Sequence, residues 1–453
     1  MYEQSQVQLV TNGDLNDPSG QIISAAGAGI SGTTTPTQFN PPLPDTTPQP
    51  ADPRNRPFGV SMAFVRKFLK DHPDIEKNAW TTSDILKFVI KPESLGTEKA
   101  YLDKFIDQRD EQGRLFISYS TVFVSHAWNY RFVAEVVDGM EQYALEHPDV
   151  YFWFDLFTND QNNVVDKDFY WFCKNLRGSI EQIGEVLLLL SPWDDPTPTK
   201  RAWCLYEISS TLDMAPNVKL TVKLPAEQVA LLVAGVRKDP KCILKALADV
   251  QAEKAEAATQ SDLDMIVAVI TRTDGGMARV NIQMKNYLRG WYLGELRKVA
   301  DGSVDDALIN SQVGYVFSDL GEYDVALEFH MKSLAIDLAT LGENHPDTAT
   351  SYGNMGSAWS SKGDYTKALE FHMKDLAIKL ATLGKNHSKT ATSYNNIGSA
   401  WSSKGDYTKA LEFLMKCLAI YLATLGENHP DTAASYGNIG GAWSDKGDYT
   451  KGL

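Results

Sequence analysis

Cysteine is scarce in this sequence, and a long apolar run is missing. The 453 residues hold only four cysteines, without paired or metal-ligand spacing: Cys173, Cys204, Cys242 and Cys417. This pattern excludes a disulfide framework and indicates a reducing compartment. No apolar run approaches the ~20 residues of a membrane span, and the polar N-terminus excludes a signal peptide. We therefore expect a soluble, cytoplasmic protein.

Positive charge is also in short supply. The chain carries 43 Lys and Arg against 58 Asp and Glu, a formal net charge of −15. Nucleic acids and anionic membranes require a basic face, so neither is expected as a main partner. Five of the eight histidines are echoes of two positions in a repeat, which places them far apart in space. We therefore expect no metal site.

The length predicts two or three domains, and the first part of the chain is unlike the rest. Residues 1–56 are rich in Gly, Thr, Gln and Pro, which predicts a disordered tail. Gly27–Gly32 matches G-x-G-x-x-G but runs into Thr33–Pro36 instead of a helix, so we do not assign it to a dinucleotide. Residues 57–117 have helical apolar spacing and are predicted to form an N-terminal helical extension.

The most informative stretch runs from residue 185 to residue 210. Glu185–Leu190 is a short, continuous apolar run, which suits a strand covered on both faces. A Pro-rich loop follows, and then helical spacing places Trp203 and Glu207 on one face of a helix. A carboxylate beside an indole at the carboxyl end of a parallel strand lies where open α/β sheets bind ligands.

This strand, loop and Trp-Cys-x-x-Glu helix resemble the third strand and following helix of a TIR (Toll/interleukin-1 receptor) domain. On that resemblance, Val122–Trp128, Val150–Asp155 and Val218–Leu224 are the first, second and fourth strands. It implies an α/β domain with a flavodoxin-like parallel sheet over residues 118–300, completed by C-terminal helices. The helices that we predict there span residues 131–145, 169–183, 227–236, 242–258, 263–270 and 283–299.

The resemblance also implies an activity, because some TIR domains hydrolyse NAD. Glu207 matches the catalytic carboxylate, and NAD would be a substrate, with no cofactor required. Breaking the nicotinamide–ribose bond builds positive charge on the ribose, which a carboxylate stabilises. Many TIR domains only self-associate, and then Glu207 would be a surface carboxylate paired with a cation such as Arg201. The resemblance assigns the nicotinamide side of the site to Ser125, His126, Trp128 and Trp203.

The C-terminal third is a repeat with a period of 42 residues. Gly321, Gly363, Gly405 and Gly447 recur at this spacing, each followed two residues later by Tyr. A Gly turn packed by an aromatic residue is typical of helix-turn-helix repeats, here longer than the ~34 residues of a plain tetratricopeptide repeat. The long unit resembles the all-α repeats of kinesin light chains over residues 308–453. The last repeat stops short, so we expect a piece of a longer chain.

Stacked repeats leave an extended concave surface made by their first helices. Amides in register on those helices resemble the side chains that hold a bound peptide. The alternative is that they recur only because the unit was duplicated and that they have no role in binding. Asp375 stands where the other repeats have Ser333 and Cys417, and we expect it to face the surface or to loosen its repeat. The amides in register are Gln312, Asn354, Asn396 and Asn438.

Together these features predict a signalling scaffold. Its repeats would bind a protein or peptide, and its TIR-like domain would self-associate and hydrolyse NAD as a nucleosidase through Glu207. The alternative is a purely non-catalytic adaptor, including a cargo adaptor of the kinesin-light-chain kind.

Overall fold

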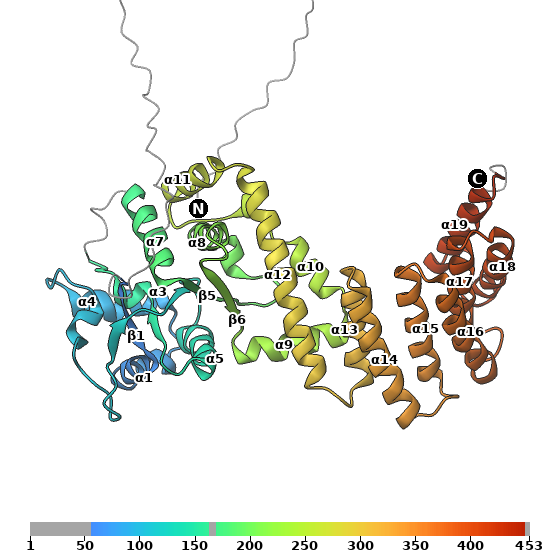
Figure 1. Ribbon diagram of the computed structural model, residues 1–453, viewed down its shortest axis with the longest axis horizontal. Helices are drawn as coiled ribbons and strands as arrows, with labels where there is room; N and C mark the ends of the chain where they lie inside the picture. Colours follow the sequence, from blue (N-terminus) through green and yellow to red (C-terminus); the bar gives the residue numbers. More distant parts are fainter. Residues whose placement is uncertain (1–55, 163–168, 449–453) are drawn as a thin grey trace, which may run out of the picture. The chain divides into compact units, whose positions relative to one another are not determined.

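The computed structural model describes residues 56–162 and 169–448, which form an α/β domain followed by helical repeats (Figure 1). Almost all of the predicted tail, residues 1–55, lies outside the described residues, as do the final residues 449–453. None of the described helices is long and apolar enough to cross a membrane.

The α/β domain is built on a six-stranded sheet in the order β2-β1-β4-β3-β5-β6. The four strands predicted from the sequence, β3 to β6, run parallel, and Phe123 of β3 pairs with both Trp153 of β4 and Val186 of β5. Their order, second, first, third and fourth along the chain, is that of doubly wound sheets. The strands span Phe58–Ser61 (β1), Ile117–Tyr119 (β2), Val122–Ser125 (β3), Tyr151–Trp153 (β4), Glu185–Leu189 (β5) and Lys219–Lys223 (β6).

The sheet is mixed, which differs from the purely parallel sheet of the prediction. Strand β1 pairs antiparallel with both β2 and β4, in registers that set Val60 opposite Ile117 and Phe152. Strand β1 lies within residues 57–117, which we had assigned to a helical extension, and β2 begins at the last residue of that range. They are only four and three residues long, too short for their apolar alternation to stand out from the helical pattern beside them.

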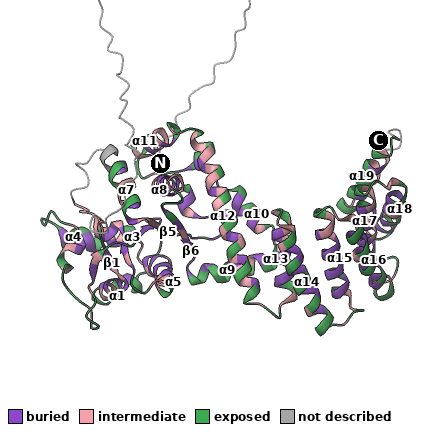
Figure 2. Cartoon of the chain, in the orientation of Figure 1, coloured by how far each residue is buried: buried purple, intermediate pink, exposed green. Residues whose placement is uncertain are grey.

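Alternation along the central strands divides the interior into two packed layers. Val122, Val124 and Leu187 belong to one core, with the N-terminal helices and α5 (Asp138–Glu146). Phe123 and Leu188 belong to the other, with α7 (Phe169–Ile183), α8 (Ala202–Asp213), α11 (Gln260–Thr271) and α12 (Gly276–Asp301). Because successive side chains of a strand point to opposite faces, helices cover both sides of the sheet. Figure 2 shows the buried residues concentrated along the strands and the inward faces of the helices.

The helices of the α/β domain agree with the prediction except near residue 250. The helix expected over residues 242–258 ends at Ala248 and is followed by a single 3₁₀ turn. The first part of the domain contains α1 (Met62–Asp71), α2 (Asp74–Lys77), α3 (Thr82–Ile85), η2 (Leu86–Ile90), α4 (Lys91–Ser94) and η3 (Tyr101–Phe105). Next come η4 (Phe132–Val137), α5 (Asp138–Glu146), α6 (Asp155–Thr158), α7 (Phe169–Ile183), η6 (Thr197–Lys200) and α8 (Ala202–Asp213). The last are α9 (Ala226–Lys238), α10 (Cys242–Ala248), η7 (Ala252–Lys254), α11 (Gln260–Thr271) and α12 (Gly276–Asp301).

The repeat region consists of paired helices, as predicted. Gly321, Gly363, Gly405 and Gly447 lie in the turns with φ between 82° and 90°, a conformation that glycine adopts without strain. The first three tyrosines that follow them begin the second helices of the pairs. The helices are α13 (Ala307–Asp319), α14 (Tyr323–Thr340), α15 (Pro346–Ser361), α16 (Tyr365–Thr382), α17 (Ser388–Ser403), α18 (Tyr407–Thr424) and α19 (Pro430–Asp445).

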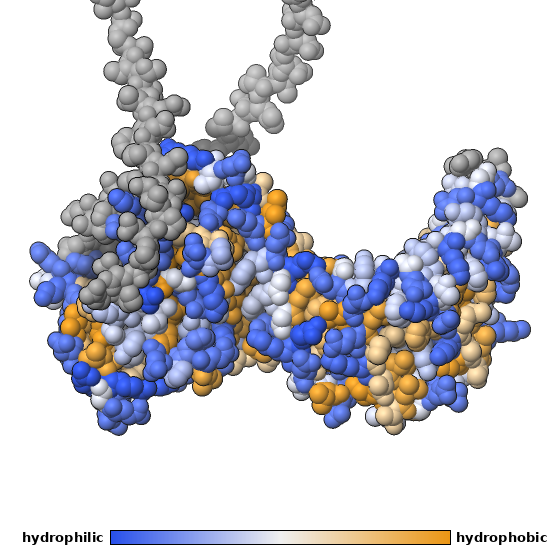
Figure 3. All heavy atoms as spheres, viewed as in Figure 1, coloured by the Kyte–Doolittle hydropathy of each residue, from blue (hydrophilic) through white to orange (hydrophobic). Residues whose placement is uncertain are grey.

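The second helices of the repeats expose apolar side chains at the repeat period. Met331, Met373 and Met415 are each about half exposed at equivalent positions of α14, α16 and α18. Figure 3 shows hydrophobic surface over this part of the repeats, between hydrophilic stretches. These methionines therefore lie at exposed positions of the second helices and not in the core.

Candidate functional site

The candidate site lies at the carboxyl end of β3, where the chain carries a serine against a carboxylate. Ser125, the last residue of β3, is buried, and its Oγ donates a hydrogen bond of 2.5 Å to Glu207 Oε2 on α8. Burial raises the pKa of Glu207 to about 8; the nearby Asp155 charge also raises it, while the Ser125 hydrogen bond lowers it. Glu207 thus holds its proton more strongly than an ordinary carboxyl. Its partner is Ser125, and the described ion pairs include none between Glu207 and Arg201.

A second carboxyl, Asp155, belongs to the same site. It begins α6, directly after β4, and its Oδ2 accepts a hydrogen bond of 2.9 Å from the indole N–H of Trp128. Its other oxygen, Oδ1, is buried and has no hydrogen-bond partner within the described chain. Burial raises the pKa of Asp155 to about 7, against the lowering effect of the Trp128 hydrogen bond.

His126 is neutral and lies deep in the site. Its ring packs against Phe154 at 4.7 Å between centroids and stacks near Trp128 at 6.1 Å. Burial and the positive charge of Arg201 lower the pKa of His126 to about 3. Its Nε2 is buried, and no described residue hydrogen-bonds to it. The backbone carbonyl of His126 accepts from the Cys204 thiol at 3.3 Å, which ties β3 to α8.

Most of the residues predicted for the nicotinamide side meet here. Ser125 and His126 are buried, while Trp128, Glu207 and Asp155 are half-buried. Trp203 is half-buried one helical turn before Glu207, with its ring edge-on to Tyr206 at 6.5 Å. Their roles remain predictions.

Sequence reasoning missed Asp155. The available signal was its position directly after a predicted strand, because the carboxyl ends of neighbouring parallel strands meet at one edge of a sheet. Among the described residues there is no group of three His, Cys, Asp or Glu side chains that could hold a metal ion. All four cysteines are free. The site can therefore offer acid groups, a neutral imidazole and indoles to a ligand.

The four amides of the repeats do not form one uniform ladder. Asn354 is buried and donates to Ser311 Oγ at 2.9 Å, while its oxygen accepts from the Tyr315 hydroxyl. These bonds join the first two repeats. Gln312 lies 3.4 Å from the backbone carbonyl of Arg237, and Asn438 donates to Asn395 at 2.8 Å. Asn396 differs because its half-buried amide forms no hydrogen bond to another described residue.

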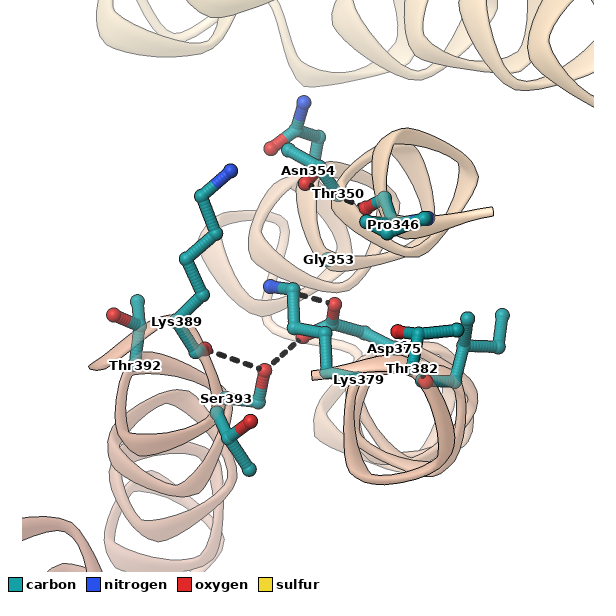
Figure 4. A network of polar contacts seen from close by, with 12 residues as sticks. Pro346, Thr350, Gly353, Asn354, Asp375, Lys379, Thr382, Lys389, Thr392 and Ser393 are labelled. Carbon is teal, nitrogen blue, oxygen red and sulfur yellow. Dashed lines mark hydrogen bonds and ion pairs between the residues drawn. The ribbon is translucent and has the colours of Figure 1, made fainter. Parts of the chain in front are cut away.

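Asp375 neither faces the surface nor stands alone, which corrects the prediction of a surface-directed side chain. It is 1% exposed, pairs with Lys379 at 2.8 Å and accepts from Ser393 Oγ at 2.5 Å. Figure 4 shows this network between α16 and α17, with Asn354 and Lys389 extending away from the pair. Burial raises the pKa of Asp375, against the lowering effects of Lys379 and Ser393. The middle repeat therefore holds a compensated buried ion pair.

Comparison with known proteins identifies the repeats. Residues 305–381 and residues 390–431 match models of the tetratricopeptide repeat. These matches cover the repeat region and not the α/β domain, so the TIR-like identity of that domain remains a prediction. No curated protein sequence matches the chain significantly.

Several solved structures are similar to the chain at low identity. BtubC (BKLC) from P. vanneervenii is 19% identical, with 50% of this chain and 85% of that chain covered and a TM-score of 0.31. A Podosopora anserina protein described as a kinesin light chain with nearly identical TPR-like repeats is 18% identical, with 50% and 90% covered and a TM-score of 0.31. MamA is 19% identical, with 38% and 86% covered and a TM-score of 0.27.

Proposed function

We propose that the chain is a scaffold whose tetratricopeptide repeats bind a protein or peptide along their first helices, α13, α15, α17 and α19. The observation that carries this proposal is the match of residues 305–381 and 390–431 to tetratricopeptide-repeat models. Arrays of this kind bind through the extended surface that equivalent helices build together. The long 42-residue unit supports the finer proposal of an adaptor of the kinesin-light-chain kind, in the cytoplasm.

Among the four predicted amides, Asn396 is the one best suited to hold a peptide backbone. The amide of Asn354 is engaged in hydrogen bonds between repeats, whereas the amide of Asn396 forms none with the residues that the structure describes. An amide can donate to a backbone carbonyl and accept from a backbone N–H at once. We therefore place the centre of the proposed peptide site on α17.

The test is capture of partners from the source cells by the full chain, compared with two variants. Asn396→Ala should weaken the binding of a captured partner at least about tenfold, which corresponds to the loss of about 1.4 kcal/mol or more of binding free energy. Met373 is half exposed on the second helix α16, and Met373→Ala should leave the binding of the partner unchanged. Loss with Met373→Ala and retention with Asn396→Ala would place the binding surface on the second helices and contradict the proposal.

We propose a second activity, hydrolysis of NAD by the α/β domain, with self-association of that domain. The 2.5 Å contact between Ser125 and Glu207, with Asp155 and His126 beside it, supports this proposal. The Ser125 hydroxyl orients the Glu207 carboxyl and favours its ionised form. In that form the carboxylate can stabilise positive charge on a ribose ring as the nicotinamide bond breaks.

Release of nicotinamide from NAD tests this activity, with the chain dilute and clustered on beads. Glu207→Gln should abolish release, because an amide cannot supply the negative charge. Glu135→Gln is a matched control, since Glu135 accepts from Ser191 Oγ at the same 2.5 Å beyond the end of β5. Release that survives Glu207→Gln, or no release by a folded, clustered parent, would leave the scaffold function alone.

A further inference from the structure

The second helices of the repeats carry an apolar stripe that faces outward. In α16, Met373, Ala377 and Leu380 follow one another at spacings of four and three residues, which places them on one side of the helix. Met373 and Ala377 are exposed, and Leu380 is half-buried at the edge of the core. The same helix buries other apolar side chains, Leu369 and Leu376, in that core. Since an apolar stripe at this spacing normally faces a core, its exposure indicates a binding surface.

The stripe recurs on the neighbouring second helices at the repeat period. The equivalent residues are Met331, Ala335 and Leu338 of α14 and Met415, Ala419 and Leu422 of α18, and all six are exposed. We call these residues, together with those of α16, the outer stripe. Figure 3 shows hydrophobic surface over this part of the repeats. Methionine side chains are flexible and polarisable, which suits them to binding surfaces. An apolar patch that returns in each repeat is an interaction site and differs from single apolar residues scattered over a surface.

Each part of the outer stripe is bordered by charges that cancel. A glutamate is followed four residues later by a lysine, and both are exposed; the pairs are Glu328 and Lys332, Glu370 and Lys374, and Glu412 and Lys416. The first and last pairs form ion pairs within their own helices, at 3.0 Å and 2.7 Å. A membrane-binding helix face carries an excess of Lys or Arg, and a strongly charged partner requires a face of the opposite sign. The outer stripe therefore favours a protein partner whose own charges are balanced.

We propose that the outer stripe binds the outer stripe of a second copy of this chain, with each second helix antiparallel to the same helix of the other copy. A two-fold axis that runs across α14, α16 and α18 sets each part of the stripe against its own counterpart, so the surface matches itself. Any other partner would need apolar groups at the spacing of three consecutive repeats. A second copy has them at that spacing already. This interface is separate from the self-association proposed for the α/β domain.

The charges decide between the two ways in which these helices can face one another. In the antiparallel arrangement, Glu370 of one copy lies toward Lys374 of the other, and the two-fold axis makes this contact twice. In a parallel arrangement each of these residues would face its own counterpart, and like charges would repel. The surface is smaller than the about 20–30 residues a side of a standard complex, so we expect a dimer that forms reversibly as concentration rises. The first helices, with the proposed peptide site, stay free in this dimer.

Analytical ultracentrifugation of the full chain between about 1 and about 100 μM tests the inference. The parent should shift from monomer to dimer over this range. A triple variant with Met331→Glu, Met373→Glu and Met415→Glu should weaken the dimer at least about tenfold, because it places charges in the apolar contact. A matched control adds the same charges at exposed positions of the loops between repeats, through Asn344→Glu, Asn386→Glu and Asn428→Glu. The control should dimerise like the parent, and circular dichroism checks that both variants are folded.

A charge exchange tests the antiparallel arrangement itself. Lys374→Glu and Glu370→Lys should each weaken the dimer, because each variant brings like charges together across the two-fold axis. An equimolar mixture of the two variants should associate more tightly than either variant alone, since every Glu of one then meets a Lys of the other. A merely structural effect of the substitutions on α16 would not be rescued by mixing.

Three results would overturn the inference. The first is a parent that stays monomeric at every concentration. The second is a dimer that the triple methionine variant leaves as strong as before, which would assign self-association to another surface, such as the α/β domain. The third is a mixture of Lys374→Glu and Glu370→Lys that associates no more tightly than its components. If the parent is monomeric and the methionine variant instead loses a partner captured from cells, the outer stripe binds a different protein.

Discussion

At the scale of single residues, Glu207 links the site to the stability of the fold. Its pKa is raised from 4.5 to about 8, so folding favours its protonated form. That contribution is complete below the unfolded pKa and is lost as the pH rises through the folded one. Glutamine resembles protonated Glu but cannot ionise. Glu207→Gln should therefore match the parent near pH 4 and exceed its unfolding free energy near pH 9, by at most about 5 kcal/mol.

Urea unfolding at the two pH values measures this difference. Asp155 contributes with the same sign over a lower pH range, since its pKa is raised to about 7. Asp155→Asn should accordingly begin to gain stability over the parent at lower pH than Glu207→Gln does. A gap between parent and variant that stays constant from pH 4 to pH 9 would show that burial does not shift these carboxyls.

Gly356 lies where two helices approach closely, so glycine is favoured there although it is a poor helix former. A Cβ at Gly356 would lie 2.5 Å from Nδ1 of His372, which is 2% exposed and has little room to move. Gly356→Ala should therefore cost about 1–3 kcal/mol, the usual range for overpacking. Gly437, on the first helix of the next-but-one repeat, has nothing within 4 Å of its added Cβ. Gly437→Ala should be neutral or stabilise by up to about 1 kcal/mol. Thermal unfolding measures the difference in stability between the two variants. If helix propensity alone determined stability, both variants would be at least as stable as the parent.

At the scale of elements, the buried ion pair of α16 can be exchanged for the residues at the equivalent positions of α18. Asp375 and Lys379 of α16 correspond to Cys417 and Tyr421 of α18. Lys379→Tyr alone would leave Asp375 buried without its cation and should cost about 3–5 kcal/mol. The double variant Asp375→Cys, Lys379→Tyr recreates the pairing of α18 and should be neutral or more stable than the parent.

Urea unfolding of the two single variants and the double variant completes the cycle. The effects of the two substitutions on the unfolding free energy should be strongly non-additive. Each single change leaves one buried charge without its partner, whereas the double change removes both charges. Additive losses would mean that Asp375 and Lys379 do not interact, and a double variant as unstable as Lys379→Tyr would mean that the middle repeat depends on the ion pair itself.

The elements also show what the sequence can and cannot predict. Strand β5 was predictable because Glu185–Leu190 is a distinct apolar run between loops, and the repeats because their period of 42 residues is visible directly. Strands β3, β4 and β6 were assigned through the resemblance to a TIR domain. Strand β1 was not predictable, since Phe58–Ser61 continues without a break into the apolar face of α1. Pairing across the chain decided it, through contacts with residues 117–119 and 151–152. The burial of Asp375 was missed for a similar reason, because it depends on Ser393 of the next helix as well as on Lys379 of its own.

At the scale of the whole molecule, the α/β domain and the first repeat share one core. A single buried cluster runs from Phe123 of β3 through Leu288 and Leu296 of α12 to Val313 of α13 and Phe329 of α14. Polar contacts reinforce it, including Arg237 with Asp306 at 2.5 Å and Arg289 with Glu322 at 2.8 Å. The predicted boundary between residues 300 and 308 therefore does not separate two independent cores. The later repeats pack in smaller clusters of their own.

This shared core predicts how far the destabilisation caused by a single cavity extends along the chain. Leu296 is fully buried in the shared cluster, and Leu296→Ala should cost about 2–5 kcal/mol. Because α8, α12 and α13 draw on the same core, hydrogen exchange should accelerate in all three helices together. Leu411→Ala is the matched control, since Leu411 belongs to the small cluster of α18 and α19 and not to the shared core. It should accelerate exchange in those helices and leave α8 and α12 unchanged, because repeats transmit stability mainly to their neighbours. If Leu296→Ala instead loosens α12 alone, the first repeat is held by its own helices, and the binding surface can move independently of the α/β site.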